Sequence, residues 1–148
     1  MHRAALVVAL ILTLWVKLGH TQSCHPDTRP SNPAPASQAL HVRIAGDFRL
    51  NEEKTRTTQL TAGKNYWLSA AGCPRMGRIR MAVVDASGKT VQVDEGDAPS
   101  FCFSPQKSGK YTVKLRALSL TGSNTWGSID AGLGASQCKN GRALGPQG

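Results

Sequence analysis

The sequence is poor in the side chains on which most active sites depend. Its 148 residues include nine acidic residues, four histidines and only three Trp, two Tyr and three Phe. It contains no GxSxG motif, no HExxH motif and no recurring pair of carboxylates at a catalytic spacing. Beyond residue 23 the histidines are His25, in a Pro-rich stretch, and His41, expected on an outward strand face. We therefore predict that the chain is not an enzyme and needs no cofactor, with a small hydrolase as the remote alternative.

Long apolar runs are missing as well. The longest, AALVVALILTLWV at residues 4–16, has 13 residues, whereas an apolar helix needs about 20 to cross a bilayer. It follows His2 and Arg3 and precedes Lys17, an arrangement typical of a secretory signal peptide. We interpret residues 1–23 as a cleaved signal peptide and expect no transmembrane segment in the mature chain. The protein is then periplasmic or secreted.

Cys24, directly after this segment, offers a second interpretation. A bacterial lipoprotein signal has a sequence close to Leu-Ala-Gly-Cys, and the four residues here are Thr21, Gln22, Ser23 and Cys24. Only the last two conform to that pattern. Lipid anchoring at Cys24 is therefore the less favoured alternative.

The chain contains only four cysteines, which is an even number. No two of the four cysteines have the CxxC spacing and no histidine lies beside the later ones, which disfavours a zinc site. Four cysteines in an exported chain predict two disulfides. Because Cys73 ends one expected strand and Cys102 lies in another strand of the same core, we expect Cys73 to pair with Cys102. Cys24 and Cys138, one on each side of the core, would then form the second disulfide.

Short runs in which apolar residues occupy every second position are abundant. Turn residues separate these runs, and no segment beyond the signal shows a helical period. About seven or eight strands at this spacing predict an all-β chain that forms a single antiparallel β-sandwich. The residues expected to face its core are Val42, Ile44, Phe48, Leu50, Tyr66, Leu68, Ala70, Ile79, Met81, Val83, Val91, Val93, Phe101, Phe103, Tyr111, Val113 and Leu115.

The composition also divides the chain into segments. Residues 24–38 are rich in proline and are expected to form an extended linker. Residues 39–138 hold the predicted sandwich. Residues 139–148 carry no pattern and are expected to form a flexible tail.

Three stretches of the core resemble the bacterial pre-peptidase C-terminal (PPC) domain. They are LTAGKNYWLSA (60–70), MAVVDASGKTVQVDEGD (81–97) and FCFSPQKSGKYTVKLRA (101–117), and the resemblance extends over about residues 42–133. It implies a jelly-roll-like β-sandwich without catalytic activity, of the kind appended to secreted bacterial enzymes as a binding or targeting module. The residues that match the family pattern are Ala62, Gly63, Tyr66, Asp85, Gly88, Asp94, Phe101, Pro105, Ser108, Gly109, Tyr111 and Val113.

Basic residues outnumber acidic ones. Removing residues 1–23 takes away Arg3 and Lys17 and no acid, which leaves 16 basic and 9 acidic residues and a net charge of +7. Such a charge favours an acidic partner, for example an anionic polysaccharide. Five cations occupy outward positions of two expected strands and a sixth lies in a nearby turn, so a cationic surface forms if the two strands share a sheet. This predicted basic stripe consists of Arg78, Arg80, Lys107, Lys110, Lys114 and Arg116; the alternative is an ordinary solvated sheet face.

Three further ligand classes are less favoured. Asp85, Asp94, Glu95 and Asp97 supply the oxygen atoms that calcium prefers, and some PPC-like domains bind calcium near comparable loops, but the DxDxDG spacing is absent. These acids are weak candidates, and no metal is predicted. Trp67 is a candidate to stack on a sugar if it is exposed, although tryptophan is more often buried. Nucleic acid is not an expected partner because aromatic residues are few and no nucleic-acid-binding motif occurs.

These features together predict an exported, non-enzymatic binding or accessory module of the bacterial periplasm or cell envelope. Its expected ligand is an anionic glycan held by the basic stripe. The alternative is a module that binds a secreted protein, as an inhibitor or a stabiliser of a secreted hydrolase.

Overall fold

The computed structural model describes residues 24, 40–135, 138–139 and 142–143. The predicted signal peptide, the Pro-rich linker beyond Cys24 with its His25, and the last five residues of the predicted tail lie outside the described residues.

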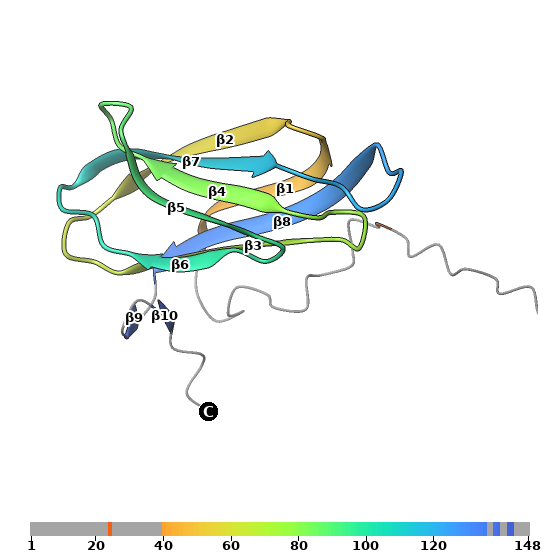
Figure 1. Cartoon of the computed structure of the whole chain (residues 1–148). Helices are drawn as coiled ribbons and strands as arrows, with labels where there is room; N and C mark the ends of the chain where they lie inside the picture. The colour runs from red at the N-terminus through yellow and green to blue at the C-terminus, as the bar shows by residue number, and fades with distance from the viewer. Residues whose placement is uncertain (1–23, 25–39, 136–137, 140–141, 144–148) are drawn as a thin grey trace, which may run out of the picture.

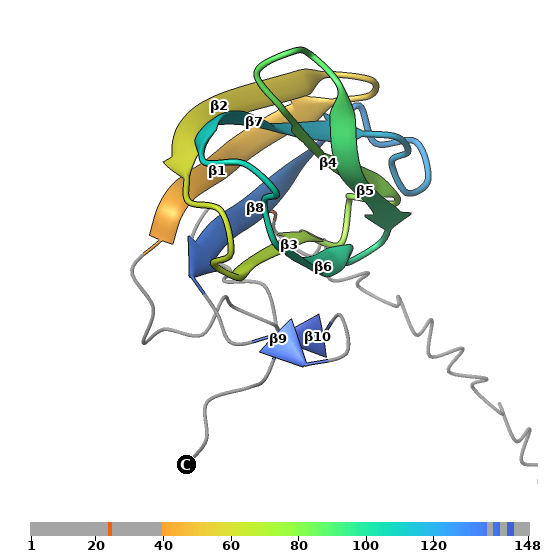
Figure 2. The ribbon, with the colours of Figure 1, turned by 90° about the vertical axis from the view of Figure 1, so that its left-hand side faces the viewer.

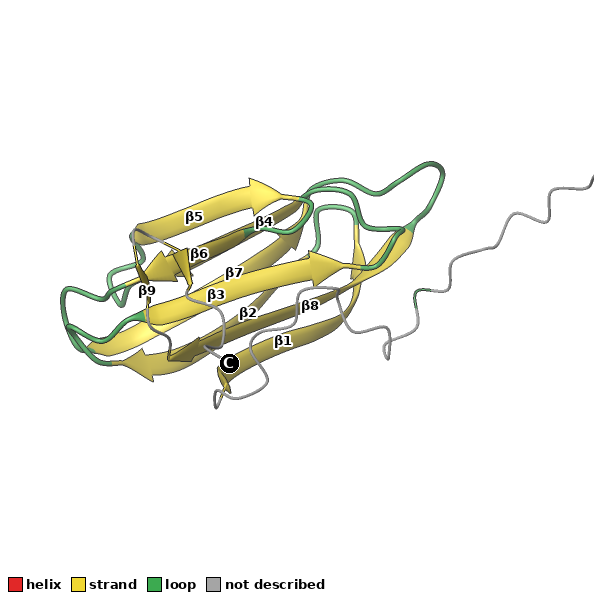
Figure 3. Cartoon of the chain, turned by 90° about the horizontal axis from the view of Figure 1, so that it is seen from below, coloured by secondary structure: helices red, strands yellow, loops and turns green. Residues whose placement is uncertain are grey.

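Two antiparallel four-stranded sheets face each other and form a sandwich (Figures 1 and 2). One sheet has the order β1-β8-β3-β6 and the other the order β2-β7-β4-β5, which is the arrangement of an eight-stranded jelly roll. The described part of the chain contains no helix, hence none long and apolar enough to cross a membrane (Figure 3). The predicted all-β sandwich is confirmed. The strands are β1 (Leu40–Arg49), β2 (Glu53–Leu60), β3 (Tyr66–Gly72), β4 (Ile79–Val84), β5 (Thr90–Gly96), β6 (Ser100–Phe103), β7 (Gly109–Ala117), β8 (Trp126–Ala135), β9 (Cys138–Lys139) and β10 (Arg142–Ala143).

The core lies between the two sheets and follows the alternation of the sequence. In β7, Tyr111, Val113 and Leu115 are buried while the residues between them face outward, because successive side chains of a strand point to opposite faces. β3 and β4 contribute to the core in the same way. The largest fully buried side chains are Tyr66, Phe48, Leu60, Leu68, Ile79, Met81, Leu115, Ile129, Leu133, Val83 and Val113.

Two residues predicted to face the core are exposed. β5 has a bulge at Val91, which packs against the core, so Val93 lies opposite Ala82 on the outer face and is 43% exposed. A bulge adds one residue to a strand and shifts the alternation beyond it. Leu50 is 53% exposed because it lies in the turn between β1 and β2, where Asn51 adopts a positive φ of 63° and the chain reverses.

The four cysteines form two disulfides, as predicted, but the expected pairing is wrong. The bonds are Cys24–Cys73 and Cys102–Cys138. Cys102 lies opposite Trp67 near the start of β3, whereas Cys73 follows the end of that strand, six residues or about 20 Å away. A disulfide needs Cα atoms within about 7 Å, so Cys73 and Cys102 cannot pair. Because the Cys24–Cys73 bond uses the thiol that lipidation needs, it argues against anchoring at Cys24.

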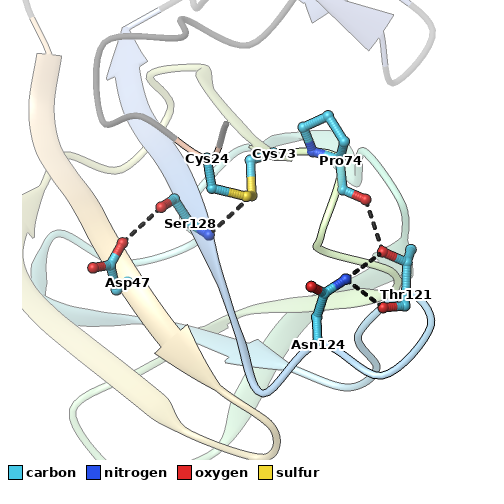
Figure 4. The surroundings of a disulfide bond; sticks show 7 residues. All are labelled: Cys24, Asp47, Cys73, Pro74, Thr121, Asn124 and Ser128. Atoms are coloured by element: carbon cyan, nitrogen blue, oxygen red, sulfur yellow. Dashed lines mark hydrogen bonds between the residues drawn. A yellow bond between two sulfur atoms is a disulfide. The ribbon is translucent and has the colours of Figure 1, made fainter. Parts of the chain in front are cut away.

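Hydrogen bonds fix the surroundings of the Cys24–Cys73 disulfide (Figure 4). The Ser128 N–H donates to Cys73 Sγ at 3.2 Å, and the Ser128 hydroxyl donates to Asp47 Oδ1 at 2.6 Å. The Thr121 hydroxyl donates to the Pro74 carbonyl at 2.8 Å. The β3–β4 loop is thereby tied to β8 and to the β7–β8 loop.

The second disulfide attaches a small ribbon to the sandwich. β9 and β10 pair as two antiparallel strands, and β10 contacts β6 (Figure 2). β10 and the second residue of β9 belong to the predicted tail, residues 139–148, in which the sequence analysis found no pattern. The Cys102–Cys138 bond joins this ribbon to β6.

Candidate anion-binding surface

The structure brings four of the six predicted basic residues onto one sheet face. β4 and β7 are neighbours in the β2-β7-β4-β5 sheet, and Arg80 lies directly opposite Arg116 on its outer side. Lys114 lies opposite Ala82 in the next outward row, and Arg78 directly precedes β4. Two like charges opposite each other on one face are destabilising in the absence of a counter-charge. This arrangement therefore favours an anion near Arg80 and Arg116.

Two glutamates from the flanking strands supply part of that counter-charge. Glu95 of β5 lies opposite Arg80 and forms ion pairs with Arg80 Nε at 3.6 Å and with Arg78 Nη2 at 3.4 Å. Glu53 of β2 forms an ion pair with Lys114 Nζ at 3.5 Å. The four cations and two carboxylates leave a net charge of +2. Exposed ion pairs of this kind contribute about 0–1 kcal/mol each, so a polyanion can displace them.

A shallow depression of about 200 Å³ lies in the middle of this surface. Both basic strands and both flanking strands contribute to it. Its lining residues are Glu53, Arg80, Ala82, Thr90, Lys114 and Arg116.

Lys107 and Lys110 line a separate cleft, and Lys110 also occupies an outward position of β7, at the end of the sheet face. Lys107, in the β6–β7 loop, and Lys110, at the start of β7, lie at one end of the sandwich, close to the β4–β5 turn (Figure 1). The cleft between that turn and that loop has a volume of about 730 Å³ and is also lined by Lys89. Lys89 is a functional candidate that the sequence analysis missed. Its position directly after the turn residue Gly88 was the only indication in the sequence that Lys89 lies at the end of a hairpin. That Lys89 and Lys107 line the same cleft follows only from the fold.

The β4–β5 turn is held by its own acid, Asp85. Asp85 Oδ1 accepts hydrogen bonds from the Ser87 N–H at 2.9 Å, the Ser87 hydroxyl at 2.6 Å and the Lys89 N–H at 3.0 Å. The bond from the Ser87 hydroxyl, followed by that from the Lys89 backbone, lowers the pKa of the Asp85 carboxyl below its ordinary value. Gly88 adopts a φ of 87°, as the turn predicted from the sequence requires. Asp85 therefore organises the turn.

The structure does not bring the four calcium candidates together. Asp94 accepts hydrogen bonds from the backbone N–H groups of Glu95 and Ser100, both at 2.9 Å, and so holds the β5–β6 loop. Glu95 points to the other side of β5, toward the arginines, and Asp97 accepts from the Ala98 N–H at 3.1 Å. Within the described ranges, no three His, Cys, Asp or Glu side chains gather as a group that could hold a metal ion.

Trp67 and His41 lie away from the basic residues. Trp67 is half-buried in β3, a strand of the opposite sheet, where it lies opposite Cys102. His41 is exposed, as predicted, and its ring meets the edge of Tyr66 with the ring centroids 5.5 Å apart. Neither side chain belongs to the sheet that carries the basic stripe.

Comparisons with known proteins give structural matches alone. No protein-family model matches the chain, and no curated protein matches it. The PPC domain of a collagenase from Bacillus anthracis is 17% identical, with a TM-score of 0.49 over 64% of this chain and 89% of that one. PliG of Aeromonas hydrophila, a periplasmic lysozyme inhibitor of g-type lysozyme, is 14% identical, with a TM-score of 0.51 over 71% of this chain and 92% of that one.

The likeness to PliG shows that the two chains share a fold. Neither match assigns a ligand or a partner to this chain.

Proposed function

We propose that the chain is an exported, non-enzymatic accessory module of the bacterial periplasm or cell envelope that binds an anionic polysaccharide through its basic stripe. The observation that carries the proposal is the direct opposition of Arg80 and Arg116 on the outer face, with Lys114 beside them. Two disulfides fit the oxidising compartments outside the cytoplasm. The stripe contains no histidine, and its flanking carboxylates are engaged in ion pairs, which supports binding without catalysis.

The geometry suits an extended polymer. The outward positions Lys110, Lys114 and Arg116 follow one another along β7 and span about 20 Å, at 3.4 Å per residue. A linear polyanion that lies along β7 therefore meets several cations in succession. Each exposed contact is weak, so the affinity comes from their number and decreases as salt screens them.

Replacing two stripe residues tests this site. The double variant Arg80→Gln/Lys114→Gln is expected to bind dextran sulfate or polygalacturonate about tenfold more weakly at low salt, since each exposed charge contact is worth about two- to fivefold in affinity. The measurement is a binding isotherm for each polymer. The double variant Lys64→Gln/Arg49→Gln is the matched control, because it removes the same charge from two exposed residues outside the stripe. Equal weakening of the variant and the control would show that net charge, and not this surface, binds the polymer.

A protein partner is the second candidate function. Val93 presents an exposed apolar side chain on the edge strand β5, beside the stripe, and the chain shares its fold with PliG, which inhibits a g-type lysozyme. On this alternative the chain lowers the activity of a secreted hydrolase. A g-type lysozyme is the first enzyme to assay, and Val93→Ser, which removes the apolar side chain without adding a charge, is expected to weaken inhibition while leaving polysaccharide binding unchanged. Full lysozyme activity in an excess of the chain would rule out this enzyme class as the partner.

A further inference from the structure

The cleft at the end of the sandwich has the dimensions of a small-molecule site. Its volume of about 730 Å³ lies within the roughly 300–1,000 Å³ of typical ligand pockets. It opens between β5 and β6, which are the edge strands of the two sheets on the same side of the sandwich (Figure 2). One wall is the β4–β5 turn with the start of β5, and the other is the end of β6 with the β6–β7 loop.

The lining of the cleft has a net positive charge, from three lysines and one carboxylate. Lys89, Lys107 and Lys110 line it, and none of the ion pairs in the described part of the chain involves them. Asp85 is its one acidic lining residue, and its Oδ1 accepts three hydrogen bonds within its own turn. The surface around Arg80 and Arg116 differs, because glutamates form ion pairs with Arg78, Arg80 and Lys114. An anionic group therefore meets less competition in the cleft than on the sheet face.

The walls of the cleft are held in place before any ligand binds. The Tyr111 hydroxyl donates to the Lys107 carbonyl at 2.8 Å, which fixes the β6–β7 loop against β7. The Ala62 N–H donates to the Ser108 hydroxyl oxygen at 2.8 Å, and so joins that loop to the neighbouring β2–β3 turn. Asp85 holds the opposite wall. A preformed site loses less conformational freedom when a ligand binds.

The rest of the lining is neutral and mixed in character. Phe103 is half-buried and packs edge-to-face on Tyr111, with ring centroids 5.6 Å apart, and forms an apolar part of the wall. Amide and hydroxyl side chains around it can donate and accept hydrogen bonds. These polar residues are Ser87, Gln92, Ser104, Gln106 and Ser108. Cations, neutral hydrogen-bonding groups and an aromatic edge together match a ligand that carries one carboxylate or sulfate group and several hydroxyls.

We propose that this cleft is a binding site for one acidic sugar unit, with Lys89, Lys107 and Lys110 around its anionic group. The inference rests on the proposed function for the choice of a sugar, while the site itself is separate from the Arg80–Arg116 surface. The sugar is the terminal or a protruding unit of the same anionic polysaccharide that lies along β7. Lys110 lines the cleft and also occupies an outward position of β7, so a single polysaccharide molecule can contact the cleft and the sheet face at once.

An NMR titration of the folded chain with sodium glucuronate tests the site. Glucuronate is expected to produce saturable shifts of the backbone amides of residues 85–92 and 102–111, whereas glucose at the same ionic strength produces none. The variant Lys89→Gln/Lys107→Gln is expected to bind glucuronate about tenfold more weakly. The stripe variant Arg80→Gln/Lys114→Gln and the control Lys64→Gln are expected to bind it unchanged. All the substituted residues are at least partly exposed, and the spectrum of each variant reports whether it is folded.

Several outcomes would overturn the assignment. Shifts that do not saturate, shifts scattered over all basic residues, or an unchanged affinity of the Lys89→Gln/Lys107→Gln variant would remove the cleft as a site. Sodium sulfate that reproduces the glucuronate shifts at equal affinity would make it a general anion site and not a sugar site. Polymer binding without glucuronate shifts overturns the cleft alone. Glucuronate shifts without polymer binding overturn the proposed role of the stripe alone.

Discussion

Removal of the Cys102–Cys138 disulfide, by Cys102→Ser with Cys138→Ser, is expected to lower the free energy of unfolding by about 4 kcal/mol. The two cysteines are 36 residues apart, and a cross-link that closes a loop of this length removes a corresponding amount of entropy from the unfolded chain, about 4 kcal/mol at 25 °C. Such a loss is a large share of the roughly 5–15 kcal/mol that stabilises a typical domain. Urea denaturation of the two forms measures it. A loss below about 1 kcal/mol would contradict the prediction.

The connectivity itself has a direct control. In the single variant Cys73→Ser, the pairing in the structure leaves Cys24 as the free thiol. The pairing expected from the sequence would instead leave Cys102 free. Alkylation of the native variant, followed by peptide mass mapping, distinguishes the two. Label at Cys102 would refute the structural pairing.

Truncation of Phe48 to alanine is expected to lower the free energy of unfolding by about 3–5 kcal/mol. Phe48 is fully buried in β1. The Lys54 ammonium lies 4.5 Å from its ring centroid and also donates to the Asp47 carbonyl at 2.6 Å. The variant therefore loses a cation–π contact together with the apolar burial, and it leaves a cavity in the core. Chemical denaturation, monitored by circular dichroism, measures the change.

Leu50→Ala is the matched control for this prediction. Leu50 lies two residues further on and would share the face of Phe48 if the alternation of β1 continued. It is instead 53% exposed in the turn, so its truncation is expected to change the free energy of unfolding by less than about 0.5 kcal/mol. Similar losses for the two variants would contradict the end of β1 described here.

Much of the fold follows from local pattern. Tyr66 and Leu68 in β3, Met81 and Val83 in β4, and Val113 in β7 were placed correctly because each strand buries one face, so a period of two fixes which side chains face inward. The turn at Gly88 was also predictable, because glycine readily adopts the positive φ that this turn requires.

The errors arose where a single residue or a distant strand decides the outcome. The bulge at Val91 places Val93 on the outer face. A prediction that assumes strict alternation along a strand does not account for an added residue. The disulfide pairing depended on which end of β3 lies beside Cys102. The register between β3 and β6 decides this, and no local sequence pattern specifies that register. The pairing of β9 with β10 was missed although Asn140-Gly141, which lies between them in the sequence, is a dipeptide typical of hairpin loops.

The positions of the basic residues in the sheet were predicted in part. Period two placed Arg80, Lys114 and Arg116 on the outside, and the structure puts their strands side by side. The flanking acids Glu53 and Glu95 come from β2 and β5, so their role as ion-pair partners could not be read without the order of the strands in the sheet. Their presence reduces the charge of the sheet face. It is also the reason that the lysine-lined cleft stands out as a separate site.

Binding of the chain without residues 1–23 to a sulfated or uronate polysaccharide, measured across a salt series, tests the central claim most directly. The account predicts tight binding at about 20 mM salt that weakens steadily as the screening length decreases from about 20 Å to 8 Å near physiological salt. It also predicts that an uncharged polysaccharide of similar length does not bind. Absence of binding at low salt, or an affinity that does not change with salt, would contradict it and leave the basic residues as a solvated sheet face.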